Sequence, residues 1–175
     1  MNVINATYEH INEILNIYHL AFNHMKNEKN YNQWTGSDET FIQSIKKYID
    51  KNEFYLMIEN NEIIAFFALI YGNDETYNII NGNWLNNDPY VTIHKVAVKY
   101  YQRGIFSKII EFVKKDAKKF NVYNIKIDTH KDNISMNTAL INKGFTYCGT
   151  ISLNKDFNDK NALRNAYQKK ITSLI

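Results

Sequence analysis

Cysteine and arginine are scarce in this sequence. The one cysteine is Cys148, and a single thiol excludes both an internal disulfide and a cysteine-rich metal site. Arginine occurs only at Arg103 and Arg164, and the lysines are scattered along predicted helix faces without an arginine–aromatic stripe. Such a pattern does not indicate nucleic-acid binding. We therefore expect neither a metal nor a nucleic acid among the ligands.

Long apolar runs and targeting signals are scarce as well. No apolar run approaches the ~18 residues of a membrane span, and the opening MNVINATYEH has neither a basic start nor an apolar core. The composition is 45% hydrophobic and 14% aromatic with a formal net charge of +3, which is typical of a globular protein. We expect one domain over residues 1–175, located in the cytoplasm and without a membrane partner.

Apolar periodicity predicts an α/β protein. We expect strands over residues 3–6, 54–59, 63–71, 91–98, 125–129, 145–153 and 162–171, and helices over 9–25, from Ser37 or Asp38 to 49, from 105 to 119, and before Gly144. Asn60 and Asn61 are the expected hairpin turn. Residues 72–89 are expected to be irregular, and a loop of that length is usually functional or mobile. The strand–helix–strand over 91–129 predicts a right-handed parallel crossover in a sheet of mixed direction.

The most informative stretch is VTIHKVAVKYYQRGIFSKIIEFVKKDAKK, residues 91–119. Its β-branched residues predict a buried strand, and the apolar period becomes helical from Ile105. Gln102, Arg103 and Gly104 form the turn between the two. A helix start presents unpaired N–H groups and the positive end of the helix dipole, so it favours an anion such as a phosphate. Gly104 lets the backbone approach such a ligand closely.

This strand–turn–helix resembles the acetyl-CoA motif of the GNAT family of N-acetyltransferases, in which Gln/Arg-x-x-Gly-x-Gly/Ala joins a strand to a helix. Three further stretches resemble a bacterial branch of that family. They are GNWL with YVTIHKVAV at 82–98, DTHKDN at 128–133 and GFTYCG at 144–149. The combination covers nearly the whole chain. It implies the GNAT fold, an α/β fold with a mixed, mostly antiparallel central sheet flanked by helices, in which parallel strands four and five are splayed apart.

The resemblance implies acetyl-CoA as co-substrate. In the family, the splayed strand bonds the pantetheine arm, a backbone N–H of that strand meets the thioester carbonyl, and the turn cradles the diphosphate. An asparagine before the short fourth helix contacts the cofactor, although Asn is also among the best helix N-caps. The implied cofactor-binding residues are Val96, Ala97, Val98, Gln102, Arg103, Gly104, Ile105, Phe106, Ser107, Lys108 and Asn133.

The sequence departs from the family pattern at three positions. Only Arg103 separates Gln102 from Gly104, so the turn is one residue shorter than in the family. Phe106 replaces the last small residue of the motif. Leu140 stands where many members carry a tyrosine that protonates the leaving thiolate, so water or Tyr147 would have to replace that acid.

Acetyl transfer to an amine also needs a base. An alkyl amine with a pKa of about 10.4 is roughly three units from neutral at physiological pH, which corresponds to roughly 4 kcal/mol. His94 is one candidate, in mid-strand and facing away from Lys95, and its alternative is a buried histidine bonded to backbone. Asp128 and His130 share a strand face and could orient a water, or form a strand-end network. The candidate catalytic residues are His94, Asp128, His130 and Tyr147.

We predict an N-acetyltransferase that moves an acetyl group from acetyl-CoA to a primary amine of a small molecule or peptide by direct attack. The alternatives are a non-catalytic CoA-binding sensor, an acyltransferase for longer acyl chains, and a structural module, which the glycine turn disfavours. The sequence leaves the acceptor and a homodimeric state open, because one fold hosts many acceptors.

Overall fold

The structure is a computed structural model and describes residues 2–27, 34, 36–101 and 103–172. It confirms the predicted fold class, because its strands form a mixed, mostly antiparallel sheet that contains a parallel pair. The described helices are α1 (Ile11–Asn27), α2 (Asp38–Ile49), α3 (Ile105–Lys119) and α4 (Ile134–Asn142). The described strands are β1 (Asn2–Asn5), β2 (Phe54–Glu59), β3 (Glu62–Tyr71), β4 (Asn81–Gly82), β5 (Val91–Val98), β6 (Asn124–Thr129), β7 (Thr146–Ser152) and β8 (Leu163–Lys170).

The chain divides into two compact units, each with its own set of strands. The first unit comprises Met1–Leu69 and Ile93–Glu111, and the second comprises Ile70–Thr92 and Phe112–Ile175. The strand order is β1-β2-β3-β5 in the first unit and β6-β8-β7-β4 in the second. A single domain over 1–175 and a splay between the two parallel strands both stay predictions.

In the first unit, β1, β2 and β3 form an antiparallel meander. Ile4 lies opposite Leu56 in the register, and Phe54 lies opposite Ala68. The predicted hairpin turn is confirmed, because Asn60 and Asn61 have φ of 52° and 62°. Two successive left-handed residues are the requirement of a type I′ turn, and asparagine tolerates that conformation well. This turn sets the register next to it, with Ile58 opposite Ile63, and a bulge between Met57 and Ile58 shifts the register beyond that point.

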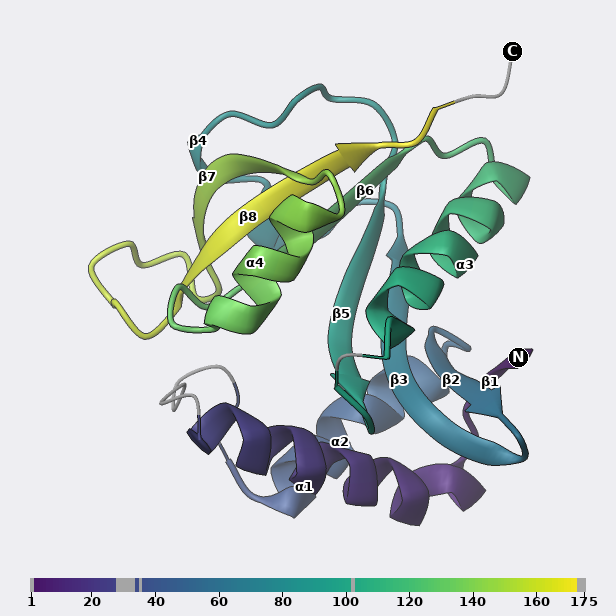
Figure 1. Cartoon of the computed structure of the whole chain (residues 1–175). Helices are drawn as coiled ribbons and strands as arrows, with labels where there is room; N and C mark the ends of the chain where they lie inside the picture. The colour runs from purple at the N-terminus through teal and green to yellow at the C-terminus, as the bar shows by residue number, and fades with distance from the viewer. Residues whose placement is uncertain (1, 28–33, 35, 102, 173–175) are drawn as a thin grey trace. The chain divides into compact units, whose positions relative to one another are not determined.

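Helices α1 and α2 of the first unit pack on its strands around one apolar core (Figure 1). Tyr18 of α1 stacks on Phe41 of α2 with ring centroids 4.0 Å apart. Helix α2 begins as predicted after Ser37, whose Oγ accepts a hydrogen bond from the Thr40 backbone N–H at 3.3 Å. Ala97 of β5 belongs to the same core. The strand that precedes the predicted cofactor turn is therefore packed against this core.

In the second unit, β8 lies between β6 and β7 and runs antiparallel to both, as predicted for the last strand. Tyr167 of β8 lies opposite Ile127 on one side and Tyr147 on the other. Helix α4 lies beside these strands (Figure 1). After it, Gly144 takes a φ of 74°, which confirms the predicted glycine at the helix end. No helix in the described part of the chain has the length and apolar content to span a membrane.

The expectation that residues 72–89 are irregular throughout is wrong. The segment contains a 3-10 turn, Glu75–Tyr77, and the short strand β4, which pairs antiparallel with β7. The pairing brings Gly82 against Gly149, and a Cβ at Gly82 would lie 2.2 Å from the Cys148 carbonyl oxygen. Only two glycines allow this approach, and periodicity alone does not show which glycine will face which.

Candidate functional site

The β5–α3 joint, residues 93–108 of the first unit, holds most of the predicted cofactor residues. In the middle of β5, Lys95 has a φ of 55°. A residue with a side chain rarely adopts this left-handed conformation, and it interrupts the regular pleat of a strand. Strict alternation therefore does not separate His94 from Lys95, and both are half-buried. Beyond the interruption, Ala97 is buried whereas Val96 and Val98 are half-buried.

The turn after β5 is braced against β3. The Lys99 backbone N–H donates to the Ile64 carbonyl oxygen at 2.8 Å. The Lys99 ammonium and the Tyr100 hydroxyl both donate to the Glu62 carboxylate. The guanidinium of Arg103 lies over the Tyr100 ring, 4.6 Å from its centroid. Gln102 lies outside the described residues.

Helix α3 begins in open surroundings. Gly104 has a φ of 68°, and a Cβ placed on it would meet nothing within 4 Å. The first turn of α3 contains no acidic residue, and Gly104 has no side chain that could cap its N–H groups. Ile105 is buried and anchors the helix, whereas Phe106 and Ser107 are half-buried. Chemically, such a helix start suits an anion.

Lys108 is exposed and forms an ion pair with Glu59, with Nζ 3.1 Å from Oε1. Exposed pairs of this kind contribute little, about 0 to 1 kcal/mol. An approaching phosphate could therefore draw the lysine away at small cost.

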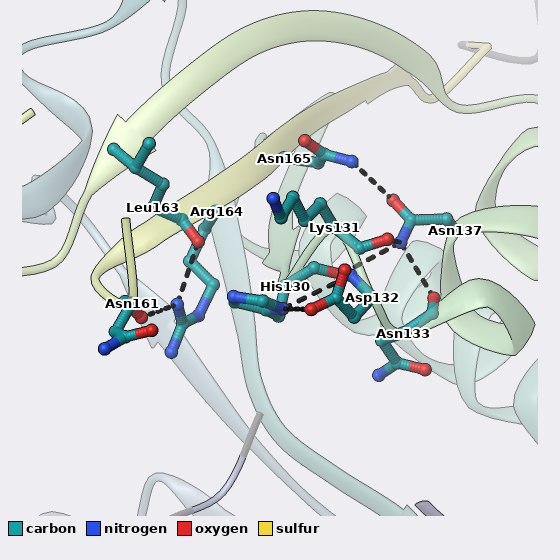
Figure 2. A network of polar contacts seen from close by, with 9 residues as sticks. All are labelled: His130, Lys131, Asp132, Asn133, Asn137, Asn161, Leu163, Arg164 and Asn165. Atoms are coloured by element: carbon teal, nitrogen blue, oxygen red, sulfur yellow. Dashed lines mark hydrogen bonds and ion pairs between the residues drawn. The ribbon is translucent and has the colours of Figure 1, made fainter. Parts of the chain in front are cut away.

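His130 and its neighbours form a polar network in the second unit, in which His130, Asn133 and Arg164 are buried (Figure 2). His130 is 1% exposed, and its Nδ1 accepts a hydrogen bond from the Asp132 backbone N–H at 3.2 Å. Burial lowers the pKa of His130, and the positive charge of Arg164 lowers it further. The lowered pKa favours the neutral ring at physiological pH. Arg164 donates from one nitrogen to the carbonyl oxygens of Asn161 and Leu163 at 2.7 and 2.8 Å.

The Asp128 carboxylate binds a hydroxyl of the 72–89 segment. Its Oδ1 accepts a hydrogen bond from Tyr77 at 2.7 Å. Burial, with the nearby Asp128 charge second, raises the pKa of Tyr77 well above 10, so this phenol stays a donor. The contact favours the strand-end network over a free catalytic carboxylate. The Trp84 indole N–H donates to the Tyr77 carbonyl oxygen at 3.0 Å, which fixes the same segment.

Asn133 is the N-cap of α4, the alternative that the sequence left open. Its Oδ1 accepts from the Met136 backbone N–H at 3.2 Å. One helical turn later, Asn137 is a centre that sequence reasoning missed. Its amide donates to the carbonyl oxygens of His130 and Asn133, at 3.0 and 2.8 Å, and its Oδ1 accepts from the Tyr167 hydroxyl at 2.7 Å and from the Asn165 amide at 2.9 Å. Asparagine is so frequent in this chain that no local signal marks the position.

Tyr147, the candidate side chain for the catalytic acid, is exposed, whereas Leu140 and Cys148 are buried. Tyr147 is 50% exposed, and its hydroxyl lies 3.3 Å from the Thr150 hydroxyl. Leu140 is 0% exposed, so its site is filled. Cys148 is buried, and burial raises the pKa of its thiol. These two features support a small core residue and not a nucleophile.

Lys126 of β6 is a second feature that sequence reasoning missed. It is 4% exposed, and its ammonium lies 4.0 Å from the ring centroid of Trp84 and 3.9 Å from that of Tyr90. Burial lowers its pKa to about 8. The sequence signal was a lysine between two buried isoleucines in NIKIDT. Trp84 thus packs against a strand side chain in the second unit.

The predicted site residues fall into two sets. His94 and the described residues of the cofactor turn belong to the first unit, and Asp128, His130, Asn133 and Tyr147 belong to the second. Within the residues that the structure describes, no group of three or more His, Cys, Asp or Glu side chains is placed to hold a metal ion.

Solved structures share this fold. A GNAT-family acetyltransferase from Streptococcus agalactiae superposes with a TM-score of 0.85 at 24% identity, over 98% of this chain and 96% of that one. A ribosomal-protein-alanine N-acetyltransferase from Brucella melitensis gives 0.62 at 15% identity, over 98% and 100%. An aminoglycoside 6′-N-acetyltransferase from Acinetobacter haemolyticus gives 0.63 at 16% identity, over 85% and 92%. No protein-family profile and no curated protein matches the sequence.

Proposed function

We propose that this chain is a cytoplasmic, acetyl-CoA-dependent N-acetyltransferase of the GNAT family, acting on a primary amine of a small molecule or peptide. The observation that carries the proposal is the β5–α3 joint. A strand interrupted at Lys95 leads into the open turn at Gly104 and a helix start without acidic residues. The interruption suits an amide-rich arm that bonds to backbone, and the helix start suits a diphosphate. The fold shared with the acetyltransferases supports the same assignment.

The reaction proposed is direct transfer. The neutral amine attacks the thioester carbonyl carbon, the nitrogen gives up one proton, the carbon–sulfur bond breaks, and the thiolate leaves and takes up a proton. Deprotonating an alkyl ammonium at neutral pH costs roughly 4 kcal/mol. A backbone N–H among residues 96–98 would stabilise the oxyanion. The leaving thiol has a pKa of about 8.5, so water suffices as the acid.

Four side chains are the proposed catalytic set. His94 is half-buried, which makes it the first candidate for the base. Asp128 lies in β6 and His130 follows directly after its end. The neutral His130 ring and the Asp128 carboxylate would orient a water, and the half-exposed Tyr147 hydroxyl would assist the thiolate. His94→Ala should lower kcat/KM by ~10²–10⁴ and leave CoA affinity nearly unchanged. Full activity in that variant would remove His94 from the set.

The cofactor site is tested by charge at the turn. Gly104→Asp places a negative charge where the diphosphate should lie, whereas Gly104→Ala adds only a methyl group in open space. Both variants carry the left-handed strain, so their difference isolates the charge. Calorimetry should show that CoA affinity falls about 100-fold more for the aspartate than for the alanine, by like-charge repulsion at a few ångströms. Equal affinities would place the diphosphate elsewhere.

A second candidate function is a CoA-binding module without catalysis. Its support is Leu140, whose side chain is fully buried where many family members carry the acidic tyrosine. Release of free thiol from acetyl-CoA with a panel of amines, amino acids, polyamines and peptides separates the two functions. Binding of acetyl-CoA without thiol release beyond the rate in buffer would favour the module. Acceptors as different as an aminoglycoside antibiotic and a ribosomal-protein alanine are named for proteins of this fold, so the panel must be broad.

A further inference from the structure

We propose that Glu62 and Tyr100 are positioning residues that hold the Arg103 guanidinium at the start of α3, where it binds the diphosphate of CoA. This inference rests on the proposed function and extends it to residues outside the GNAT motif. All three side chains lie in the first unit.

Glu62 is the fixed end of the arrangement. It is the first residue of β3, and its carboxylate accepts from the Lys99 ammonium and from the Tyr100 hydroxyl, which lies 3.0 Å from both carboxylate oxygens. The hydrogen bond from Lys99, followed by that from Tyr100, lowers the pKa of Glu62. The carboxylate is therefore ionised at neutral pH and committed to these partners. The Arg103 charge also contributes to this lowering, but among the described residues no ion pair joins the carboxylate to the guanidinium.

Tyr100 transmits this fixed position to Arg103. Its hydroxyl is held by Glu62, and its ring lies under the guanidinium at 4.6 Å. A cation over an aromatic ring is attracted by the ring without using an N–H hydrogen bond. Within the described part of the chain, the Arg103 N–H groups donate to no other residue. They remain available for a planar, two-point contact with phosphate oxygens.

The position of Arg103 in the sequence explains why holding its side chain in place would help binding. Arg103 immediately precedes Gly104, in a turn one residue shorter than the GNAT pattern that it resembles. A free arginine loses much rotamer freedom when it binds a ligand, and holding it beforehand reduces that loss. Glu62, Lys99 and Arg103 together also leave one net positive charge at the turn, which favours an anionic ligand.

The test is calorimetric titration of the full chain with CoA and with acetylpantetheine, which carries the thioester arm without phosphates. Arg103→Ala should weaken CoA binding about 10- to 100-fold, as expected for charge-assisted bonds. Tyr100→Leu should weaken it about 2- to 5-fold, and should have no further effect in the Arg103→Ala background. Acetylpantetheine affinity should stay constant in every variant.

Glu62→Gln decides the role by the sign of its effect. If Glu62 were only a negative charge near the phosphates, its removal would tighten CoA binding. If it positions Tyr100 and Arg103, its removal weakens CoA binding about 2- to 5-fold. Tyr8→Leu is the matched control, because Tyr8 also has its hydroxyl on a carboxylate, that of Asp50, and a lysine ammonium 5.4 Å from its ring centroid. It should leave CoA affinity unchanged.

The outcomes separate the two proposals. Tighter CoA binding by Glu62→Gln, or additive losses in the Tyr100→Leu and Arg103→Ala double variant, overturns the positioning role and leaves the acetyltransferase proposal intact. Absence of CoA binding by the unaltered protein overturns both. Melting temperatures of all variants should agree within a few degrees, and an equal loss of CoA and acetylpantetheine affinity would show that the turn has merely collapsed.

Discussion

The turn between β5 and α3 and the network around His130 use polar side chains in opposite ways. At the turn, Arg103 and Gly104 are exposed, and the helix start is open. In the network, His130 and Arg164 are buried and bonded to backbone groups (Figure 2). A buried polar group must be satisfied by its own chain, since leaving it unpaired costs about 1–3 kcal/mol. The turn therefore leaves its polar groups to a ligand, whereas the network directs most of its hydrogen bonds to the chain itself.

The largest effect should come from the closest backbone contact in the second unit. Gly82→Ala places a Cβ 2.2 Å from the Cys148 carbonyl oxygen at a φ of 142°. We expect a loss of about 3–5 kcal/mol in unfolding free energy, from overpacking and strain together. Gly104→Ala is the counterpart at the open turn and should cost only about 1–2 kcal/mol, from the left-handed conformation alone. Urea denaturation measures both, and equal losses would remove the contrast.

The next effect concerns Lys126 and pH. Its folded pKa of about 8 lies below the unfolded value, about 10.4. Below pH 8 the lysine is charged in both states and the cost of burying the charge is fully present. As pH rises from 8 towards 10, the folded state loses the proton first, so stability increases. The limit is about 3 kcal/mol, at 1.36 kcal/mol per pKa unit.

Comparison with Lys126→Met isolates this group, because the remaining titrations are common to both proteins. Between pH 8 and 9.5, the unfolding free energy of the unaltered protein should rise relative to that of the variant. A difference in unfolding free energy that stays constant over this range would show that Lys126 has an ordinary pKa. Trp84→Leu should reduce the burial of the Lys126 ammonium and raise its pKa, so the gain in stability should begin at a higher pH.

Asn137→Ala should have an intermediate effect. It removes the acceptor of the Tyr167 hydroxyl and the donor to the His130 carbonyl oxygen. Because Asn137 is half-buried, water can satisfy part of what is lost, and we expect a loss of about 2 kcal/mol. Thermal unfolding checks the size. An unchanged melting temperature would mean that the network does not stabilise the fold.

The smallest effect on stability should come from Tyr147→Phe. The hydroxyl is half-exposed and makes one long contact of 3.3 Å with Thr150, so the unfolding free energy should change by no more than about 0.5 kcal/mol. Its effect on activity is informative for that reason. A fall in kcat without a change in stability would identify this tyrosine as the acid, and an unchanged kcat would leave water in that role.

Periodicity located most elements of this chain. The Asn60-Asn61 turn, the Ser37 cap and the glycine after α4 were predicted because each is a local rule tied to a residue type. The β4–β7 pairing was missed, because it depends on two glycines meeting across 67 residues of sequence (Gly82 and Gly149). In the candidate site, the residues of the glycine turn were predicted from the strand–turn–helix pattern. The hydrogen bonds that Glu62, Tyr100 and Asn137 make were not, since they join residues distant in the sequence.

By itself, then, the sequence determined the order and type of the elements, the placement of a glycine turn between a strand and a helix, and the resemblance that implies acetyl-CoA. These are properties of neighbouring residues, and local backbone preference and apolar spacing are enough to reveal them. Only the tertiary structure decided which polar groups are already committed. Asp128 binds Tyr77, and Asn133 caps α4, whereas the Arg103 guanidinium lies over an aromatic ring and donates to none of the residues that the structure describes. Burial and hydrogen bonding depend on residues brought together from far along the chain, so that distinction exists only in the folded protein.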